Sequence, residues 1–194
     1  MSIQRRTWWR YGIDLLVIVI GILIAFWLNQ WAENSKSNQQ FQEKIGGVKN
    51  EIRRNLMEVD EAYTYHDSLM NLIISNPEKA ILRLNPANIQ DYSWQIFQNS
   101  NLESHLPYEK YALLTEVYSI QSGLEDHNQR MVDLIHLSNI AEGLSGKSIN
   151  KREVRNISFK RSWIPILEDA TPYERILSEK YQEALEQLSA SKSN

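Results

Sequence analysis

Four histidines and a short acidic cluster are the side chains of this 194-residue chain best suited to proton transfer or metal binding. The histidines are His66, His105, His127 and His136. No two of them lie three or four residues apart, so one face of a helix cannot offer a metal ion two imidazole ligands. Glu58, Asp60 and Glu61 lie close together, a pattern typical of a solvated helix face. These residues predict no metal site.

The sequence lacks the motifs that are typical of common catalytic sites. There is no Gly-rich phosphate loop, no His-Glu-x-x-His pair, no Gly-x-Ser-x-Gly turn and no acidic calcium loop. The chain also has no cysteine, which excludes disulfides, thiolate zinc sites and thiol nucleophiles. We therefore predict no catalytic residue, no metal ligand and no cofactor, and we expect that the protein is not an enzyme.

An apolar run near the N-terminus predicts a membrane span. The fourteen residues 15–28 contain no charged side chain. Aromatic residues flank the run on both sides, at Trp8, Trp9, Tyr11, Trp27 and Trp31. A helix from Tyr11 to Trp31 would cover about 30 Å, the thickness of the hydrocarbon core, with aromatic rings at both interfaces. We expect a transmembrane helix over residues 11–31.

The alternative to an uncleaved anchor is a signal peptide, because three arginines precede the apolar core. Residues 26–32 are mostly bulky and lack the small-x-small pattern of a cleavage site, which favours the anchor. Residues 1–10 carry three Arg and no acidic side chain, whereas residues 29–44 carry two Lys and two Glu. The positive-inside rule therefore predicts a cytoplasmic segment 1–10, a single-pass anchor in the inner membrane and an extracytoplasmic domain over residues 33–191.

Three residues of the predicted span could contact a second helix. Gly21 and Ala25 form a small-xxx-small pair that permits close approach of another span. Asp14 is the ionisable residue of the segment. It could act as a proton relay or bond a partner helix, or it could lie near the headgroups and pair with Arg10.

The rest of the chain predicts four helices, over residues of about 36–75, 87–99, 107–142 and 172–189. The first carries a 4,3-spaced stripe: Phe41, Ile45, Val48, Ile52, Asn55, Val59, Ala62, His66, Leu69 and Ile73. The third carries Leu113, Val117, Ile120, Leu124, His127, Met131, Leu134, Ser138 and Ala141. Gly46 and Gly47 predict a kink or fraying in the first helix. Thr171, Pro172 and Glu174 match a capping box at the start of the last.

These stripes predict an all-α fold with an up-and-down helical bundle outside the membrane. The other possible use of the first stripe is a parallel coiled coil between chains, with Asn55 setting the register. The stripe has a flanking apolar row, so it is wider than a two-stranded seam and favours the bundle. His66 and His127 interrupt the two stripes at similar places, so they could face each other.

The charge distribution singles out one basic patch. Its members are Lys147, Lys151, Arg152, Arg155, Lys160 and Arg161. Residues 33–146 carry 9 basic and 16 acidic groups, so the patch could neutralise its own domain or contact anionic headgroups or an acidic partner. The net charge of −3 and the predicted export argue against nucleic acid.

The N-terminal motif resembles a known family. The segment 11–14, the Val-Ile-Gly-Ile-Leu-Ile-Ala core at 19–25 and the exit at 28–33 are similar to the anchor of a family of uncharacterised small bacterial membrane proteins. The segment 94–118 is similar to the second half of that family. Asp14, where Glu is more typical, and Trp27 depart from the pattern. The resemblance implies the topology and adds no activity.

Two functions are compatible with these features. The first is a membrane-anchored interaction or scaffold protein, an accessory subunit whose helical domain binds a protein partner or a second copy of itself. The alternative is an extracytoplasmic module that senses a small molecule between its helices.

Overall fold

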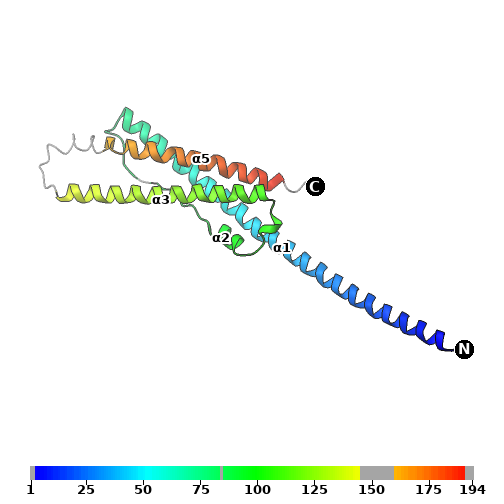
Figure 1. Cartoon of the computed structure of the whole chain (residues 1–194). Helices are drawn as coiled ribbons and strands as arrows, with labels where there is room; N and C mark the ends of the chain where they lie inside the picture. The colour runs from blue at the N-terminus through cyan, green and yellow to red at the C-terminus, as the bar shows by residue number, and fades with distance from the viewer. Residues whose placement is uncertain (1–2, 84, 145–159, 191–194) are drawn as a thin grey trace. The chain divides into compact units, whose positions relative to one another are not determined.

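The computed structural model describes residues 3–83, 85–144 and 160–190. Within these ranges all regular structure is helical, as the sequence predicts (Figure 1). The elements are α1 (Ile3–Ser75), α2 (Tyr92–Gln98), the 3-10 helix η1 (Glu103–His105), α3 (Tyr108–Leu144) and α5 (Ile164–Ser189). The chain divides into two compact units, Met1–Ile45 and Gly46–Asn194.

The first unit is the N-terminal part of α1. The expected separation between a span ending at Trp31 and a helix starting near residue 36 is wrong, because α1 has no break there. Residues 32–40 contain neither Gly nor Pro, and the Asn29 amide donates to Glu33 at 2.9 Å one turn later. The helix also continues through Gly46 and Gly47, where the sequence suggested a kink; the boundary between the two units falls at Gly46.

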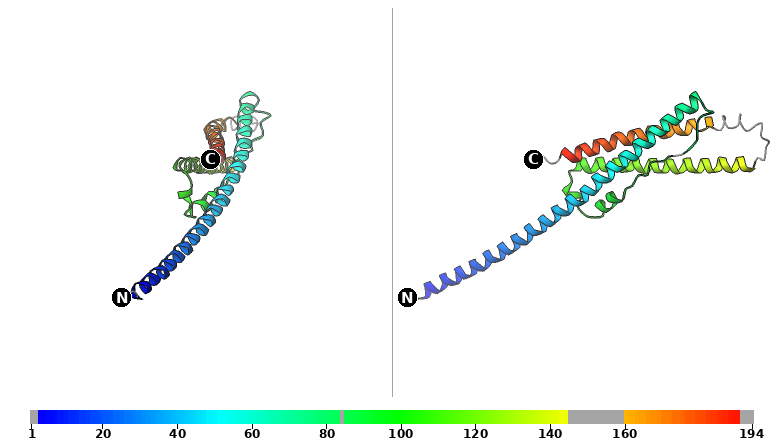
Figure 2. Two further views of the ribbon diagram at one scale, coloured as in Figure 1. Left: turned by 90° about the vertical axis from the view of Figure 1, so that its right-hand side faces the viewer. Right: turned by 180° about the vertical axis from the view of Figure 1, so that it is seen from behind.

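The second unit is built from α3, α5 and the part of α1 after Ile45 (Figures 1 and 2). The predicted stripe of α1 is confirmed, because every 4,3-spaced position from Val48 to Ile73 is buried. At one end, Leu69, Ile73, Ala80, Trp163 and Leu167 form one apolar cluster. The cluster joins α1, the segment after it and the start of α5.

The helix order differs from a simple up-and-down bundle. Tyr118 and Gln121 of α3 bond Glu51 and Asn55 of α1, so these two helices run in the same direction. The bonds of α5 run the other way along α1, from Ser178–Asp60 to Glu174–His66. A connector after Ser75 therefore returns the chain along α1 before α3 begins, which is the long-crossover variant of a bundle.

The connector explains why α2 begins at Tyr92 and not at residue 87 as expected. Its backbone groups bond side chains of α1: the Asn88 N–H donates to Glu58 at 3.3 Å, and Gln90 pairs with Asn55. These bonds tie the segment before Tyr92 to α1 without regular structure, so the helix starts later. The bounds of α3 agree with the expected 107–142 to within two residues.

The predicted start of the last helix is wrong. The helix begins at Ile164 with Pro165 in its first turn, and Pro172 lies inside it. Thr171 Oγ1 donates to the Leu167 carbonyl at 3.0 Å, a bond within the helix and not a cap. Leu167 and Ala170 are fully buried, so tertiary packing of the residues before Pro172 outweighs the local capping signal.

Candidate functional site

The polar residues inside the second unit form the most distinctive feature of the described chain, and we call them the polar seam. Its members are Glu51, Asn55, His66, Tyr118, Gln121, Asn128, Glu174, Ser178 and Tyr181. All of them are buried, and most bond a different helix from their own. Burying a polar group is costly unless it is hydrogen-bonded, so these contacts define which helices pack together.

Glu51 joins α1 to α2 and α3. Its carboxylate accepts the backbone N–H groups of Ser93 at 2.6 Å and Trp94 at 3.3 Å, which lie in the first turn of α2. No side chain of α2 itself caps these groups. Tyr118 of α3 donates its hydroxyl to the same carboxylate at 2.7 Å, and its ring stacks on Trp94 with centroids 5.2 Å apart. Glu51 therefore acts as a cap supplied by another helix.

Asn55 is the residue that would set the register in the alternative fold, a parallel coiled coil between chains. Its Nδ2 donates to the Gln90 carbonyl at 2.5 Å, and its Oδ1 accepts the Gln90 N–H at 3.0 Å. Gln121 accepts from Asn55 at 3.3 Å and from the Tyr181 hydroxyl at 2.6 Å. These bonds connect α1, α3 and α5 of one chain, which supports the bundle over a seam between chains.

Burial changes the acidity of the two seam tyrosines. Desolvation, followed by the hydrogen bond to Glu51, raises the pKa of Tyr118 well above its ordinary value. Desolvation also raises the pKa of Tyr181. Both hydroxyls therefore remain donors at physiological pH, as their bonds to Glu51 and Gln121 require.

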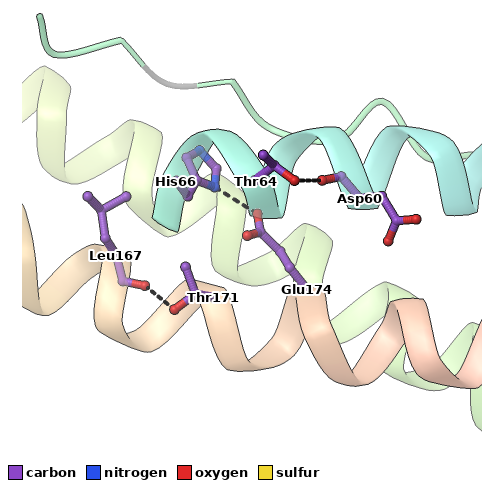
Figure 3. Close-up of polar contacts among 6 residues, drawn as sticks. All are labelled: Asp60, Thr64, His66, Leu167, Thr171 and Glu174. Atoms are coloured by element: carbon purple, nitrogen blue, oxygen red, sulfur yellow. Dashed lines mark hydrogen bonds and ion pairs between the residues drawn. The ribbon is translucent and has the colours of Figure 1, made fainter. Parts of the chain in front are cut away.

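His66 and Glu174 form a fully buried pair (Figure 3). His66 Nδ1 lies 2.8 Å from Glu174 Oε1, and both side chains are 0% exposed. Glu174 reaches across from α5 to α1, so the sequence interpretation of this residue as part of a capping box is wrong. Within the described chain, His66 Nε2 and Glu174 Oε2 have no hydrogen-bond partner.

The second histidine of the bundle also points to α5. His127 Nδ1 lies 3.4 Å from Asp169 Oδ2, and its ring stacks on Tyr173 with centroids 5.9 Å apart. Each histidine thus contacts its own acidic residue on α5, and the idea that His66 and His127 face each other is wrong. Among the residues that the structure describes, no group of three or more His, Asp or Glu is arranged to hold a metal ion.

The buried face of α3 is displaced from the predicted stripe. Leu113, Val117, Leu124 and Met131 are buried as expected, whereas Ile120 and His127 are half-buried. Gln121 and Asn128 take the buried positions. The signal was present in the sequence as a second 3,4 repeat, which runs Leu114, Val117, Gln121, Leu124, Asn128 and Met131.

The predicted anchor residues lie in the first unit. Trp27 and Trp31 are 65% and 62% exposed, and an added Cβ at Gly21 would meet no atom within 4 Å. Asp14 and Ala25 are also exposed. The side chains of Trp8, Trp9 and Tyr11 fall outside the described residues. In the described part of the chain one helix, α1, is long and apolar enough to cross a bilayer, by length and composition alone.

The structure describes two members of the predicted basic patch, Lys160 and Arg161. Lys147, Lys151, Arg152 and Arg155 lie outside the described residues. Lys160 donates to the Glu78 carbonyl at 3.2 Å, and Arg161 is exposed. Lys160 therefore holds the start of α5 against the segment that follows α1, a structural contact within the chain.

No protein-family model, no curated protein and no solved structure matches the chain. The resemblance to small bacterial membrane proteins stays a prediction.

Proposed function

We propose that the protein is a single-pass membrane protein whose extracytoplasmic helical bundle is an interaction module, an accessory subunit that binds a protein partner or a second copy of itself. The apolar part of α1 is the observation that supports the proposed membrane anchor. Its side chains are exposed over residues 15–28, unlike those of a core helix. We expect an exposed apolar surface of this length to be shielded from water, and the hydrocarbon core of a lipid bilayer matches its length.

The interaction role is supported by how the bundle uses its side chains. The polar seam is committed to bonds between α1, α3 and α5, so it holds the bundle together. Large apolar side chains remain on the surface. On α2, Tyr92 and Ile96 are one turn apart and are 68% and 41% exposed. Exposed apolar residues on one face are typical of contact surfaces.

A pair of reporter fusions tests the anchor and its orientation. A reporter that is active outside the cytoplasm should work when fused after Asn194 and fail when fused before Met1. The chain should also stay with membranes through alkaline washing. Activity of the N-terminal fusion alone would refute the orientation, and release of a shortened chain would establish a cleaved signal peptide.

Purification of the full chain from mildly solubilised membranes tests the interaction role. We expect a stoichiometric protein complex, or a homo-oligomer, that Ile96→Ser weakens. Gln95→Ser, a neighbouring change at an exposed polar position, should leave the complex intact. A monomer that carries a bound small molecule would favour the sensing function instead.

A further inference from the structure

The segment that follows α1 carries a row of exposed side chains at one end of the bundle. Exposure alternates along residues 79–83. Ala80 and Leu82 pack in the apolar cluster that joins this segment to α1 and α5. Lys79, Ile81 and Arg83 are exposed. An alternation of this kind places the three exposed side chains on the same side of the segment.

The start of α5 adds two basic residues to the same end. Lys160 donates to the Glu78 carbonyl at 3.2 Å, and Trp163 lies in the apolar cluster. Arg161, between them, is exposed. The end of α1 and the start of α5 lie side by side at this end of the bundle (Figures 1 and 2). We call the region the basic end, and its cations are Lys79, Arg83, Lys160 and Arg161.

The basic end contrasts in charge with the rest of the bundle. Over residues 46–83, 85–144 and 160–190, the other basic side chains number 7, against 20 acidic ones. Among the described residues, no ion pair involves a cation of the basic end. The bond of Lys160 goes to a backbone carbonyl, which does not compensate its charge. Glu78 is the acidic side chain of the same segment, so the basic end keeps a net positive charge.

Exposed apolar side chains accompany these cations. Ile81 lies between Lys79 and Arg83 in the sequence and is 81% exposed, and Ile74 in the last turn of α1 is 57% exposed. A row of cation, apolar side chain and cation complements a row of two carboxylates with an apolar side chain between them. Charge complementarity would supply specificity and speed association, while burial of the isoleucine would add affinity.

We infer that the basic end is a docking site for a short acidic segment of a partner protein, in which an apolar residue lies between acidic ones. The inference rests on the proposed function, because it names the chemistry of the partner that the interaction module binds. A short segment fits better than a nucleic acid, an anionic polymer or a lipid surface. Those extended polyanions would also meet the acidic remainder of the bundle and be repelled by it.

Peptide binding to the purified full chain in a nonionic detergent tests the inference. The probe is a short fluorescent peptide in which Leu alternates with Glu, and its control is the same peptide with Gln in place of Glu. Micelles without protein are the blank. Fluorescence anisotropy should show that the Glu peptide binds at least about tenfold more tightly than the Gln peptide, and that added salt weakens this binding.

Charge reversal locates the site. Lys79→Glu combined with Arg83→Glu should weaken binding of the Glu peptide at least about tenfold. Arg53→Glu combined with Arg175→Glu is the matched control, because it reverses two exposed cations elsewhere on the bundle, and it should change the affinity by less than about twofold. If the first double variant loses its helical circular dichroism, Lys79→Gln combined with Arg83→Gln replaces it, with a smaller loss of affinity in the same direction.

The apolar contact has its own variant. Ile81→Ser should weaken binding of the Glu peptide about fivefold or more, because the buried isoleucine side chain is lost. Met57→Ser, at a position of α1 that is 67% exposed, should leave it unchanged.

Equal binding of the two peptides, or binding that charge reversal at Lys79 and Arg83 leaves unchanged, would overturn the inference. Tighter binding to vesicles of anionic phospholipid than to the Glu peptide would also overturn it, as would self-association of the chain through the basic end. The complex purified from membranes is a separate result. If that complex forms and depends on Ile96 while the Glu peptide does not bind, the proposed function stands and the acidic docking site does not.

Discussion

Tyr118 of α3 donates its hydroxyl to Glu51 of α1 at 2.7 Å, and the same carboxylate caps the first turn of α2. One buried acidic side chain therefore joins three helices. The tyrosine ring stacks on Trp94 of α2, with an angle of 4° between the ring planes. The hydroxyl and the ring thus reinforce the same junction.

Removing the Tyr118 hydroxyl should weaken this junction without disturbing the stacked ring. Tyr118→Phe leaves one oxygen of a buried carboxylate without its strongest donor, so we expect a loss of about 1–3 kcal/mol in the free energy of unfolding. Tyr111→Phe is the matched control, because the Tyr111 ring also contacts Trp94 and its side chain is half-buried. Denaturant unfolding measures both. Equal losses in the two variants would contradict the role of the Glu51 bond.

The raised pKa values of Tyr118 and Tyr181 predict a loss of stability in alkali. The unfolded chain ionises tyrosine near about pH 10, whereas the folded chain keeps these two protonated, so stability that is present below about pH 10 falls as the pH rises further. Of the nine tyrosines, these two should ionise only as helicity is lost. Tyrosinate absorbance and circular dichroism recorded together measure this. Full ionisation of all nine at unchanged helicity would disprove the prediction.

The bonds of Asn55 predict that the bundle is a property of one chain. Asn55→Leu leaves the Gln90 N–H and carbonyl without their side-chain partner, and we expect a loss of more than about 2 kcal/mol. Asn50→Leu, at an exposed position of α1, should change stability by less than about 0.5 kcal/mol. The fragment 34–194 should be monomeric. Helicity that increases with protein concentration would favour the coiled coil between chains.

Pro172 offers a test of where α5 begins. Inside a helix, proline leaves the carbonyl four residues earlier without its N–H donor, so Pro172→Ala should stabilise the chain by about 1–3 kcal/mol. Pro165→Ala should have little effect, since proline is well accommodated in a first turn. Thermal unfolding compares the two. If Pro172→Ala destabilises the chain and Pro165→Ala does not, the result would instead favour a helix that starts at Thr171.

The buried stripe of α1 could be predicted from the sequence because its repeat is long and mostly apolar. Eight positions from Val48 to Ile73 follow the 4,3 spacing, and the two polar members, Asn55 and His66, are buried with the rest. Over so many turns the period of the repeat determines which face is buried, even where single positions of the repeat are polar.

The errors arose where polar residues take part in packing. The apolar pattern of α3 predicted that Ile120 is buried, although the buried residue is the neighbouring Gln121, which bonds Asn55 and Tyr181. Glu174 fits a capping box locally, yet its partner His66 lies 108 residues away. Such partners are set by the tertiary fold, so local patterns do not reveal them.

Gly21 and Ala25 lie one turn apart on α1, and Asp14 lies near the same face at about 100° per residue. In lipid, small residues allow close helix approach and a carboxyl group can add a bond between helices. An added Cβ at Gly21 meets no atom within 4 Å outside the adjacent helix backbone, so we expect Gly21→Leu to leave the monomer unchanged. We therefore expect Gly21→Leu to weaken self-association of the proposed anchor in an intramembrane assay, and Asp14→Ala to weaken it further. Leu16→Ala, at another exposed position of the helix, is the control. If neither Gly21→Leu nor Asp14→Ala alters association, this face of the proposed anchor makes no contact with a second helix, and any homo-oligomer has to form through the helical bundle.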